Sequence, residues 1–556
     1  MLKNLDKKVS VNVLFWTVLT VNLAILPSVS LDPINSPKLF FLGIGGVVSF
    51  ALLLKSLRSN LTNLKSSHFF LAIALIASIS FSLLAGGRFE DQFFGVFGRN
   101  TGFLALISLI IVFLLATTIS GPYLIDKLKL AMFISGTLAL VYGLMQVFDA
   151  DPVDWQPSGY TDIFGFLGNP NFQSAYLGMF GSLLSAYFID RETRNRNRVL
   201  ALIGILCIVF VIIKSESEQG LLVLISGVLV CVLSWMIKMR KKATFLSTLG
   251  ASSIAFLMTL LGLLNKGPLA PLLYKDSIQF RGDYWRAAWN LGLDNPFFGV
   301  GIDRYGENYR LYRDQIATSR RGPDVTSNSP HNVFLDFLTN SGFLGFALYI
   351  SLNAITLIAV YRYMRRTERF SVGFIGLFAA WIAYVAQSLI SVNQLGLAVW
   401  GWVLMGALIG FVSTPDLVVP AGINSKKHHQ ISRELPSAGI VLTTYIAIGV
   451  GVLISILPIY RDIKVVSALK TGDALKIENE AYERPLQASV MFQIASILTS
   501  NNLHEASLRV TRAATKSFPD TYEIWRLLTM IPGATEVEKS QAILRMKELD
   551  PLNDSI

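Results

Sequence analysis

Long apolar segments follow one another along most of this chain, separated by short polar connections. A helix needs about 20 consecutive apolar residues to cross the hydrocarbon core of a membrane. Thirteen segments approach that length, and we predict a spanning helix at each: 11–30, 38–54, 69–85, 102–120, 130–148, 172–189, 199–213, 219–237, 244–264, 342–360, 371–391, 395–412 and 438–459. The segment at 199–213 is short for a full crossing, so the expectation is 12 to 13 transmembrane helices.

Two intervals break this pattern: a polar loop at 265–341 and a mostly polar tail at 460–556. The pattern therefore predicts an all-α polytopic membrane protein with a transmembrane domain at 1–459 and a small helical tail. Composition agrees, because 52% of the residues are hydrophobic, 15% are charged and the mean hydropathy is +0.52. A soluble fold could not bury that much apolar surface. Cys207 and Cys231 fall inside predicted spans, so we expect buried thiols and no disulfide framework.

Basic residues in the short connections predict the orientation, since Lys and Arg are retained on the cytoplasmic side during insertion. They gather in alternate connections: Lys3, Lys7, Lys8; Lys55, Arg58, Lys65; Lys127, Lys129; Arg191, Arg194, Arg196, Arg198; Lys238, Arg240, Lys241, Lys242; Arg362, Arg365, Arg366, Arg369; Lys426, Lys427, Arg433. This places the amino terminus in the cytoplasm and both the 265–341 loop and the tail outside. The net charge of +11 thus reflects topology, and no nucleic-acid partner is expected. The first segment could instead be a cleaved signal peptide, which would leave every later span oriented as before.

Two short outer loops hold candidate contacts for an anionic substrate. Arg88 and Arg99 flank a loop rich in glycine and aromatic residues, which could equally be a connector anchored at the membrane interface. Asn169 and Asn171 lie where the loop 149–171 meets the next span, so they can cap that helix and also face a substrate.

Acidic residues suggest two further sites, each with a simpler alternative. Asp149-Ala-Asp151 matches the Asp-x-Asp by which many glycosyltransferases hold a divalent metal, although acidic residues in outer loops are usually just solvated. Glu216 and Glu218 lie in the 214–220 hairpin, where either could accept a proton or pair with a loop arginine. A solvated turn is the default interpretation of that hairpin.

The 265–341 loop contains most of the candidate chemistry. Arg281 and Trp285 are four residues apart, so a helix would put both on one face, with Arg286 next to them. Arginine stays protonated and its planar fork matches phosphate oxygens two at a time. For the later arginines, from Arg304 to Arg321, ordinary solvated contacts are the favoured interpretation.

His331 is the one histidine in this loop, within Ser329-Pro-His-Asn332. A neutral imidazole can take a proton from a hydroxyl near pH 7, and Asn332 can orient the ring or bind a sugar hydroxyl. The alternative is that His331 only caps the following helix. Gly342 and Gly345 follow, and we expect them on one helix face where another backbone comes close.

The order of these motifs resembles the O-antigen ligase and polymerase superfamily. The resemblance rests on Arg281-x-x-x-Trp285, the Pro296-Phe-Phe-Gly-Val-Gly301 turn and His331-Asn332 followed after nine residues by Gly342-x-x-Gly345, with Gly168-Asn-Pro-Asn171 as a looser match. It extends loosely over 90–410. Many members carry an arginine where Glu218 stands, so the phosphate-binding role of that hairpin is in doubt here.

The resemblance implies a glycosyltransferase of a bacterial inner membrane that takes glycan from a polyprenyl-diphosphate carrier. It implies that Arg281 and His331 are catalytic, with inversion and no cofactor or required metal, and that the acceptor is a lipid, glycan or protein hydroxyl. Substrate contacts are then expected from Arg286, Asn332, Asn169, Asn171, Glu218, Arg88 and Arg99. Two alternatives stay open: a metal-dependent glycosyltransferase built on Asp149 and Asp151, and a transporter of lipid-linked glycan. A transporter normally needs ionisable residues within its spans, and these spans hold few.

The tail predicts four helices, near 485–500, 503–516, 520–530 and 536–549. Phe518-Pro-Asp520 and Asp550-Pro-Leu552 close the second and fourth at similar positions, which resembles two degenerate tetratricopeptide-like repeats. Two units are fewer than such repeats usually need for stability alone, so we expect the tail to lean on the membrane domain or on a partner.

Overall fold

The computed structural model of the chain describes residues 4–59, 66–153, 155, 163–367, 371–413 and 438–556. Within these ranges the regular structure is helical and there is no strand, as the sequence predicted. Some of the basic residues that predict the orientation lie outside the described residues: Lys3, Lys65, Arg369, Lys426, Lys427 and Arg433.

Each of the thirteen predicted spans overlaps a helix of one bundle. These helices are α1 (Asn4–Leu23), α2 (Asn35–Ser59), α3 (Ser67–Ala85), α5 (Phe103–Thr117), α6 (Pro122–Val147), α7 (Pro170–Ile189), α8 (Asn195–Lys214), α9 (Glu218–Lys238), α10 (Lys242–Leu263), α15 (Val333–Arg366), α16 (Val372–Ser388), α17 (Leu395–Val412) and α18 (Ala438–Thr471). Nine helices in the described ranges are long and apolar enough to cross a membrane: α2, α3, α6, α8, α9, α10, α15, α17 and α18. The chain is a multi-pass, all-α membrane protein, and the exact number of crossings stays a prediction.

Burial separates the centre of the bundle from its rim. In α17, 94% of the apolar stretch is buried, and Trp400 and Trp402 are fully enclosed. In α10 only 6% is buried, and this helix packs mainly against α9 and α11 (Ala270–Leu273). A helix that is apolar on all sides suits either place, because lipid tails solvate apolar side chains as well as a protein core does.

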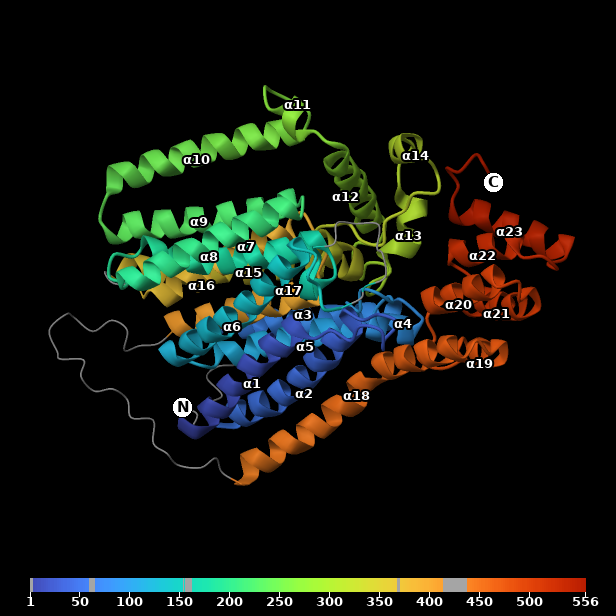
Figure 1. Cartoon of the computed structure of the whole chain (residues 1–556), viewed down its shortest axis with the longest axis horizontal. Helices are drawn as coiled ribbons and strands as arrows, with labels where there is room; N and C mark the ends of the chain where they lie inside the picture. The colour runs from blue at the N-terminus through green and yellow to red at the C-terminus, as the bar shows by residue number, and fades with distance from the viewer. Residues whose placement is uncertain (1–3, 60–65, 154, 156–162, 368–370, 414–437) are drawn as a thin grey trace.

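The polar loop folds at one end of the bundle, opposite the amino terminus (Figure 1). It forms α12 (Asp276–Asp294), α13 (Tyr305–Tyr312) and α14 (Gln315–Arg321), and the short α4 (Phe89–Phe94) lies at the same end. The one-turn helix η2 (Gly165–Leu167) precedes α7. The tail lies at this end too, so the loop and the tail are on one side of the bundle (Figure 1).

A backbone break divides α15, and the expectation that Gly342 and Gly345 share one helix face is wrong. Ser341 and Gly342 have non-helical dihedrals, with Gly342 at φ 68°. The Phe343 N–H donates to the Pro296 carbonyl at 2.8 Å, and a Cβ on Gly342 would lie 2.4 Å from that same oxygen. Gly342 therefore permits both the positive φ and the close approach of another chain segment.

The turn at 295–301 fits into this break. Gly299 has φ 64°, and a Cβ there would meet the Thr339 carbonyl at 2.2 Å. The Val300 N–H donates to that carbonyl at 2.9 Å. The glycines of the turn and of α15 thus act together, and they fix where the large loop joins the bundle.

The four predicted tail helices are present as α20 (Ala488–Ser500), α21 (His504–Ser517), α22 (Tyr522–Met530) and α23 (Glu536–Leu549), preceded by an unpredicted α19 (Ala474–Glu480). They share one apolar core that includes Ile494, Val510 and Leu528. Their likeness to tetratricopeptide repeats stays a prediction. The last bundle helix, α18, continues past the predicted boundary at 460 to Thr471, so Arg461 belongs to that helix.

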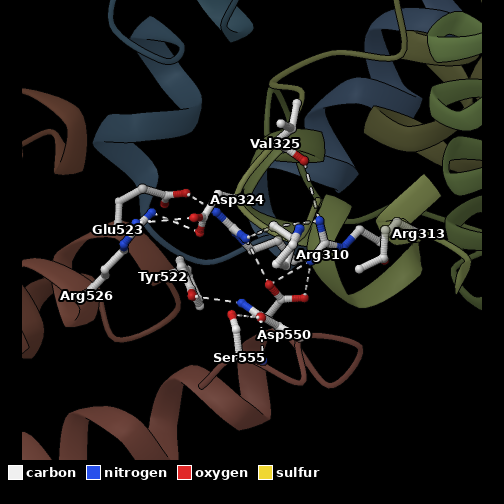
Figure 2. A network of polar contacts seen from close by, with 12 residues as sticks. Arg310, Arg313, Asp324, Val325, Tyr522, Glu523, Arg526, Asp550 and Ser555 are labelled. Atoms are coloured by element: carbon white, nitrogen blue, oxygen red, sulfur yellow. Dashed lines mark hydrogen bonds and ion pairs between the residues drawn. The ribbon is translucent and has the colours of Figure 1, made fainter. Parts of the chain in front are cut away.

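Ion pairs join the tail to the large loop, as Figure 2 shows. Asp550, fully buried at the end of α23, accepts two bonds from Arg313 at 2.6 and 2.8 Å and one from Arg310 at 2.8 Å. Arg310 also lies 3.8 Å from the centre of the Tyr522 ring and 3.3 Å from Glu523. The tail rests on the membrane domain, as its small number of helices led us to expect.

Candidate active site

Helix α12 positions Arg281 on its first turns. The stretch is helical, so Arg281 and Trp285, which are four residues apart, share a face. The Arg281 Nε donates to the Ile390 carbonyl at 2.9 Å and Nη1 to the Ser277 carbonyl at 3.2 Å. Arg281 forms no ion pair within the described residues, and burial lowers its pKa. A partly buried guanidinium without a carboxylate partner is suited to binding an anionic ligand.

His331 lies just before α15 in a left-handed conformation, with φ 52°. A non-glycine residue with positive φ is uncommon, and such strain persists where the surroundings hold it in place. Here the backbone N–H donates to the Ser329 hydroxyl at 3.1 Å, and the imidazole stacks on Tyr284 with ring centres 5.3 Å apart. The ring is therefore held in one orientation.

The contact at Nδ1 assigns the tautomer of His331. Nδ1 lies 3.1 Å from the Ser329 carbonyl oxygen. A carbonyl oxygen can only accept a hydrogen bond, so Nδ1 carries the proton and Nε2 presents its lone pair. An imidazole in this state can accept a proton from a hydroxyl group.

Burial is the largest cause of the lowered pKa of His331, which falls to about 4. The hydrogen bond to the Ser329 carbonyl opposes this shift, and the positive charges of Arg281, Arg99 and Arg321 add to it. The imidazole is therefore neutral at pH 7. The same interaction shows that Arg281 and His331 are electrostatic neighbours, although 50 residues of sequence separate them. The two residues predicted to be catalytic occupy one region of the fold.

Arg321 joins this group, although its sequence context did not distinguish it from the neighbouring arginines. Its guanidinium lies 3.6 Å from the centre of the Phe280 ring and donates to the Tyr284 hydroxyl. Like Arg281, it has no ion pair within the described part of the chain. The Arg320-Arg321 pair was visible in the sequence, but a sequence does not reveal which of two adjacent arginines has a carboxylate partner. Arg320 has one, since it binds Asp283 at 2.7 Å.

The other predicted arginines are already paired with carboxylates. Arg286 binds Asp314 at 2.6 Å and Asp283 at 2.7 Å. Arg88 binds Glu307, and Arg99 lies 3.3 Å from Asp303 and 3.8 Å from Asp336. These pairs connect the 86–100 loop to the large loop. The substrate contacts predicted for Arg286, Arg88 and Arg99 are less favoured than that of Arg281, because their charge is already neutralised.

Two of the three predicted asparagines, Asn332 and Asn169, serve as helix caps. The Asn332 side chain accepts from the Phe334 and Leu335 N–H groups and donates to the Leu389 carbonyl at 3.0 Å. Asn169 caps α7 by accepting from the Asn171 N–H at 2.9 Å. These bonds account for the asparagines structurally, and their substrate-facing roles stay predictions.

The hairpin before α9 packs against the start of α7. Asn171 accepts a bond from the Ser217 hydroxyl at 2.9 Å. Glu218 forms an ion pair with Lys275, so its partner is a lysine of the large loop and not an arginine. The negative charge of Glu218 also acts on Arg281.

The two carboxylates of the Asp-x-Asp pair have different surroundings. Asp151 accepts bonds from the Tyr142 hydroxyl at 3.0 Å, the Gln146 amide at 2.8 Å and the Val153 N–H at 2.9 Å. Asp149 is exposed and has φ 55°. Asp151 therefore stabilises the conformation of its own loop through these hydrogen bonds. No group of three or more potential metal ligands occurs in the described residues.

Comparison with known proteins supports the assignment of this region. Residues 203–350 match the family model described as O-antigen ligase. This segment is an O-antigen ligase family domain. A search of curated proteins finds no match to the chain.

The O-antigen ligase domain runs from within α8 to the middle of α15, so it includes Glu218, Arg281, Arg321 and His331. The two residues predicted to be catalytic and Arg321 therefore lie inside the matched segment, whereas Arg99, whose charge also acts on His331, lies outside it. The tail and α1 to α7 lie outside it. The resemblance seen in the loop motifs is confirmed, and it supports a glycosyl-transfer function at a membrane.

Proposed function

We propose that this protein transfers glycan from a polyprenyl-diphosphate carrier to an acceptor hydroxyl at the outer face of a bacterial inner membrane. The observation that carries the proposal is a neutral imidazole, held in one orientation, next to two guanidinium groups that have no carboxylate partner among the described residues. A lipid diphosphate bears its negative charge on the leaving group, so fixed cations are needed at the bond that breaks. The amino terminus is then cytoplasmic, and the large loop and tail are outside.

In the proposed step, Nε2 of His331 takes the proton of the acceptor hydroxyl as its oxygen attacks the anomeric carbon. The bond from that carbon to the phosphate oxygen breaks, and the diphosphate leaves with the electron pair. Arg281 and Arg321 neutralise the charge that develops on it. Attack opposite the leaving group inverts the anomeric centre. The bound diphosphate also opposes the positive field around His331, which raises the pKa of the imidazole and makes it a better base in the complex.

The test of the function is transfer by purified protein in lipid nanodiscs. The donor is lipid-linked glycan extracted from the producing cells, and candidate acceptors are added one at a time. A ladder of products identifies a polymerase, and a single addition to lipid or protein identifies a transferase. Undiminished transfer in chelator is expected, because guanidinium groups supply the positive charge. Movement of the donor without any covalent change would favour the transporter alternative.

Replacing Arg281 with glutamine is expected to raise the KM for the donor by about 10- to 150-fold, the range for losing a hydrogen bond to a charged group of about 1.5–3 kcal/mol. Arg286→Gln is the matched control, since Asp283 and Asp314 already neutralise Arg286. Its donor KM should change far less. Equal effects of the two substitutions would contradict a special role for Arg281.

The pH dependence of kcat/KM should lack a limb near the ordinary histidine pKa. Since burial and nearby arginines lower the pKa of His331 to about 4, the free enzyme keeps the neutral base down to about that pH. Activity should therefore be level from pH 8 to pH 5 and fall only near pH 4. A fall centred at pH 6.5 in the parent would contradict the burial of a catalytic His331.

A further inference from the structure

A cavity of about 310 Å³ lies where three parts of the chain meet: the 86–100 loop, the large loop and the tail. Its lining includes Asp91 and Phe97 from the first, Ser327 and Asn328 from the second, and Phe492 and Thr521 from the tail. The volume is at the lower end of ligand-binding pockets, which is about 300 Å³. The tail thus supplies one wall of a hollow next to the candidate active site.

Among the described residues of the lining, one polar group has no hydrogen-bond partner and one carboxylate has only a long ionic contact. The Thr521 hydroxyl is buried and makes no hydrogen bond. Asp91 has one ionic contact, with Arg88 at 3.8 Å, and burial raises the pKa of Asp91 to about 7. A buried hydroxyl without a partner costs about 1–3 kcal/mol, so the hydroxyl of Thr521, a residue that lines the cavity, is a candidate ligand contact.

The charge of the lining argues against a phosphate as occupant. Asp303, Glu307 and Glu523 line the cavity beside Asp91, and Arg304 is the one cation among the lining residues. Phe97 and Phe492 add two aromatic rings. Hydroxyl, amide and carboxyl groups beside aromatic rings suit a sugar, which offers hydroxyls at its edge and C–H groups on its faces.

The cavity is close to the proposed base. Ser327 lines it and its hydroxyl lies 3.5 Å from Nδ1 of His331. Asp303 lines it as well and pairs with Arg99, whose charge acts on His331. A glycan reacting at His331 could therefore extend a neighbouring sugar into this hollow.

We propose that this cavity is a sugar subsite that binds an uncharged ring of the donor or acceptor glycan, with the tail as part of the recognition surface. The inference rests on the proposed function and names a second substrate contact for it. It also gives the tail a direct role in choosing the glycan. Donor and acceptor sugars share the chemistry that fits here, and kinetics distinguish them.

The test fills the cavity from the tail side. Ser489 lines it on the first turn of α20, so Ser489→Trp should block it. Ser500→Trp, at the exposed far end of the same helix, is the matched control. The probe is the lipid-free oligosaccharide released from the donor by mild acid, with binding measured by calorimetry in nanodiscs. We expect Ser489→Trp to weaken binding at least tenfold and Ser500→Trp to leave it unchanged.

Thr521→Val is the milder variant, in case tryptophan disturbs the tail. Losing one hydrogen bond should weaken binding by about 2- to 10-fold. In transfer assays, a rise in the donor KM alone assigns the subsite to the donor glycan, and a rise in the acceptor KM alone assigns it to the acceptor. Parent-like oligosaccharide binding in both cavity variants would overturn the subsite. If the parent protein binds the oligosaccharide but performs no transfer, and these variants lose that binding, then the proposed function is overturned and the subsite stands.

Discussion

Replacing His331 with alanine should lower kcat for glycan transfer by about 10²- to 10⁴-fold, the usual contribution of a positioned general base. The imidazole is neutral, its Nδ1 proton is held by the Ser329 carbonyl, and its Nε2 lone pair is available. Alanine removes the proton acceptor and leaves the two guanidinium groups in place. The donor KM should therefore change much less than kcat. Initial rates with saturating donor and acceptor measure the effect.

His504→Ala, in the tail, is the control for removing a histidine as such. It should transfer at the parent rate. The thermal unfolding midpoint of each variant in nanodiscs shows whether the fold survives. Parent-like kcat in a folded His331→Ala protein would end the base assignment, whereas the family match and the membrane fold would stand.

Replacing Asp550 with asparagine should release the tail from the large loop. Asp550 is fully buried between Arg310 and Arg313, which are themselves 4% and 1% exposed. Removing one partner of a buried ion pair leaves uncompensated charge and costs about 3–5 kcal/mol. Both arginines lie in the interface between the large loop and the tail (Figure 2), so we expect α22 and α23 to become accessible to protease and to hydrogen exchange.

Asp554→Asn is the matched control, because it makes the same change at an exposed position four residues away. Its exchange and digestion patterns should match those of the parent. If the tail of Asp550→Asn stays protected, then the apolar contacts alone hold it. The same variant should also weaken oligosaccharide binding, since the tail forms one wall of the proposed sugar subsite.

The helices were predictable because their signals are local. A run of apolar residues long enough to cross a membrane specifies a helix whatever surrounds it, since the bilayer leaves every backbone group to be satisfied within the segment. All thirteen predicted segments overlap a helix, and the four tail helices lie close to their predicted bounds. The exception is informative. Gly342 ends one helix and begins another, because the 295–301 turn inserts there, and that turn is distant in sequence.

The candidate site was predictable only in part. Motif order singled out Arg281 and His331, and both lie in one region of the fold. The same reasoning gave Arg286 a substrate contact and set Arg321 aside, whereas the structure pairs Arg286 with two carboxylates and leaves Arg321 without one. Residue type indicates that a side chain is charged. It does not indicate whether another part of the chain neutralises that charge.

By itself the sequence determined the class of the protein, the positions of its helices and the family of its central segment, because hydropathy and motif spacing are properties of contiguous residues. Tertiary structure alone decided which arginines stay available, how low the pKa of His331 falls, and that the tail closes a cavity beside it. Those properties depend on burial and on distances between residues hundreds of positions apart, such as Arg313 and Asp550. Such distances are set when the chain folds.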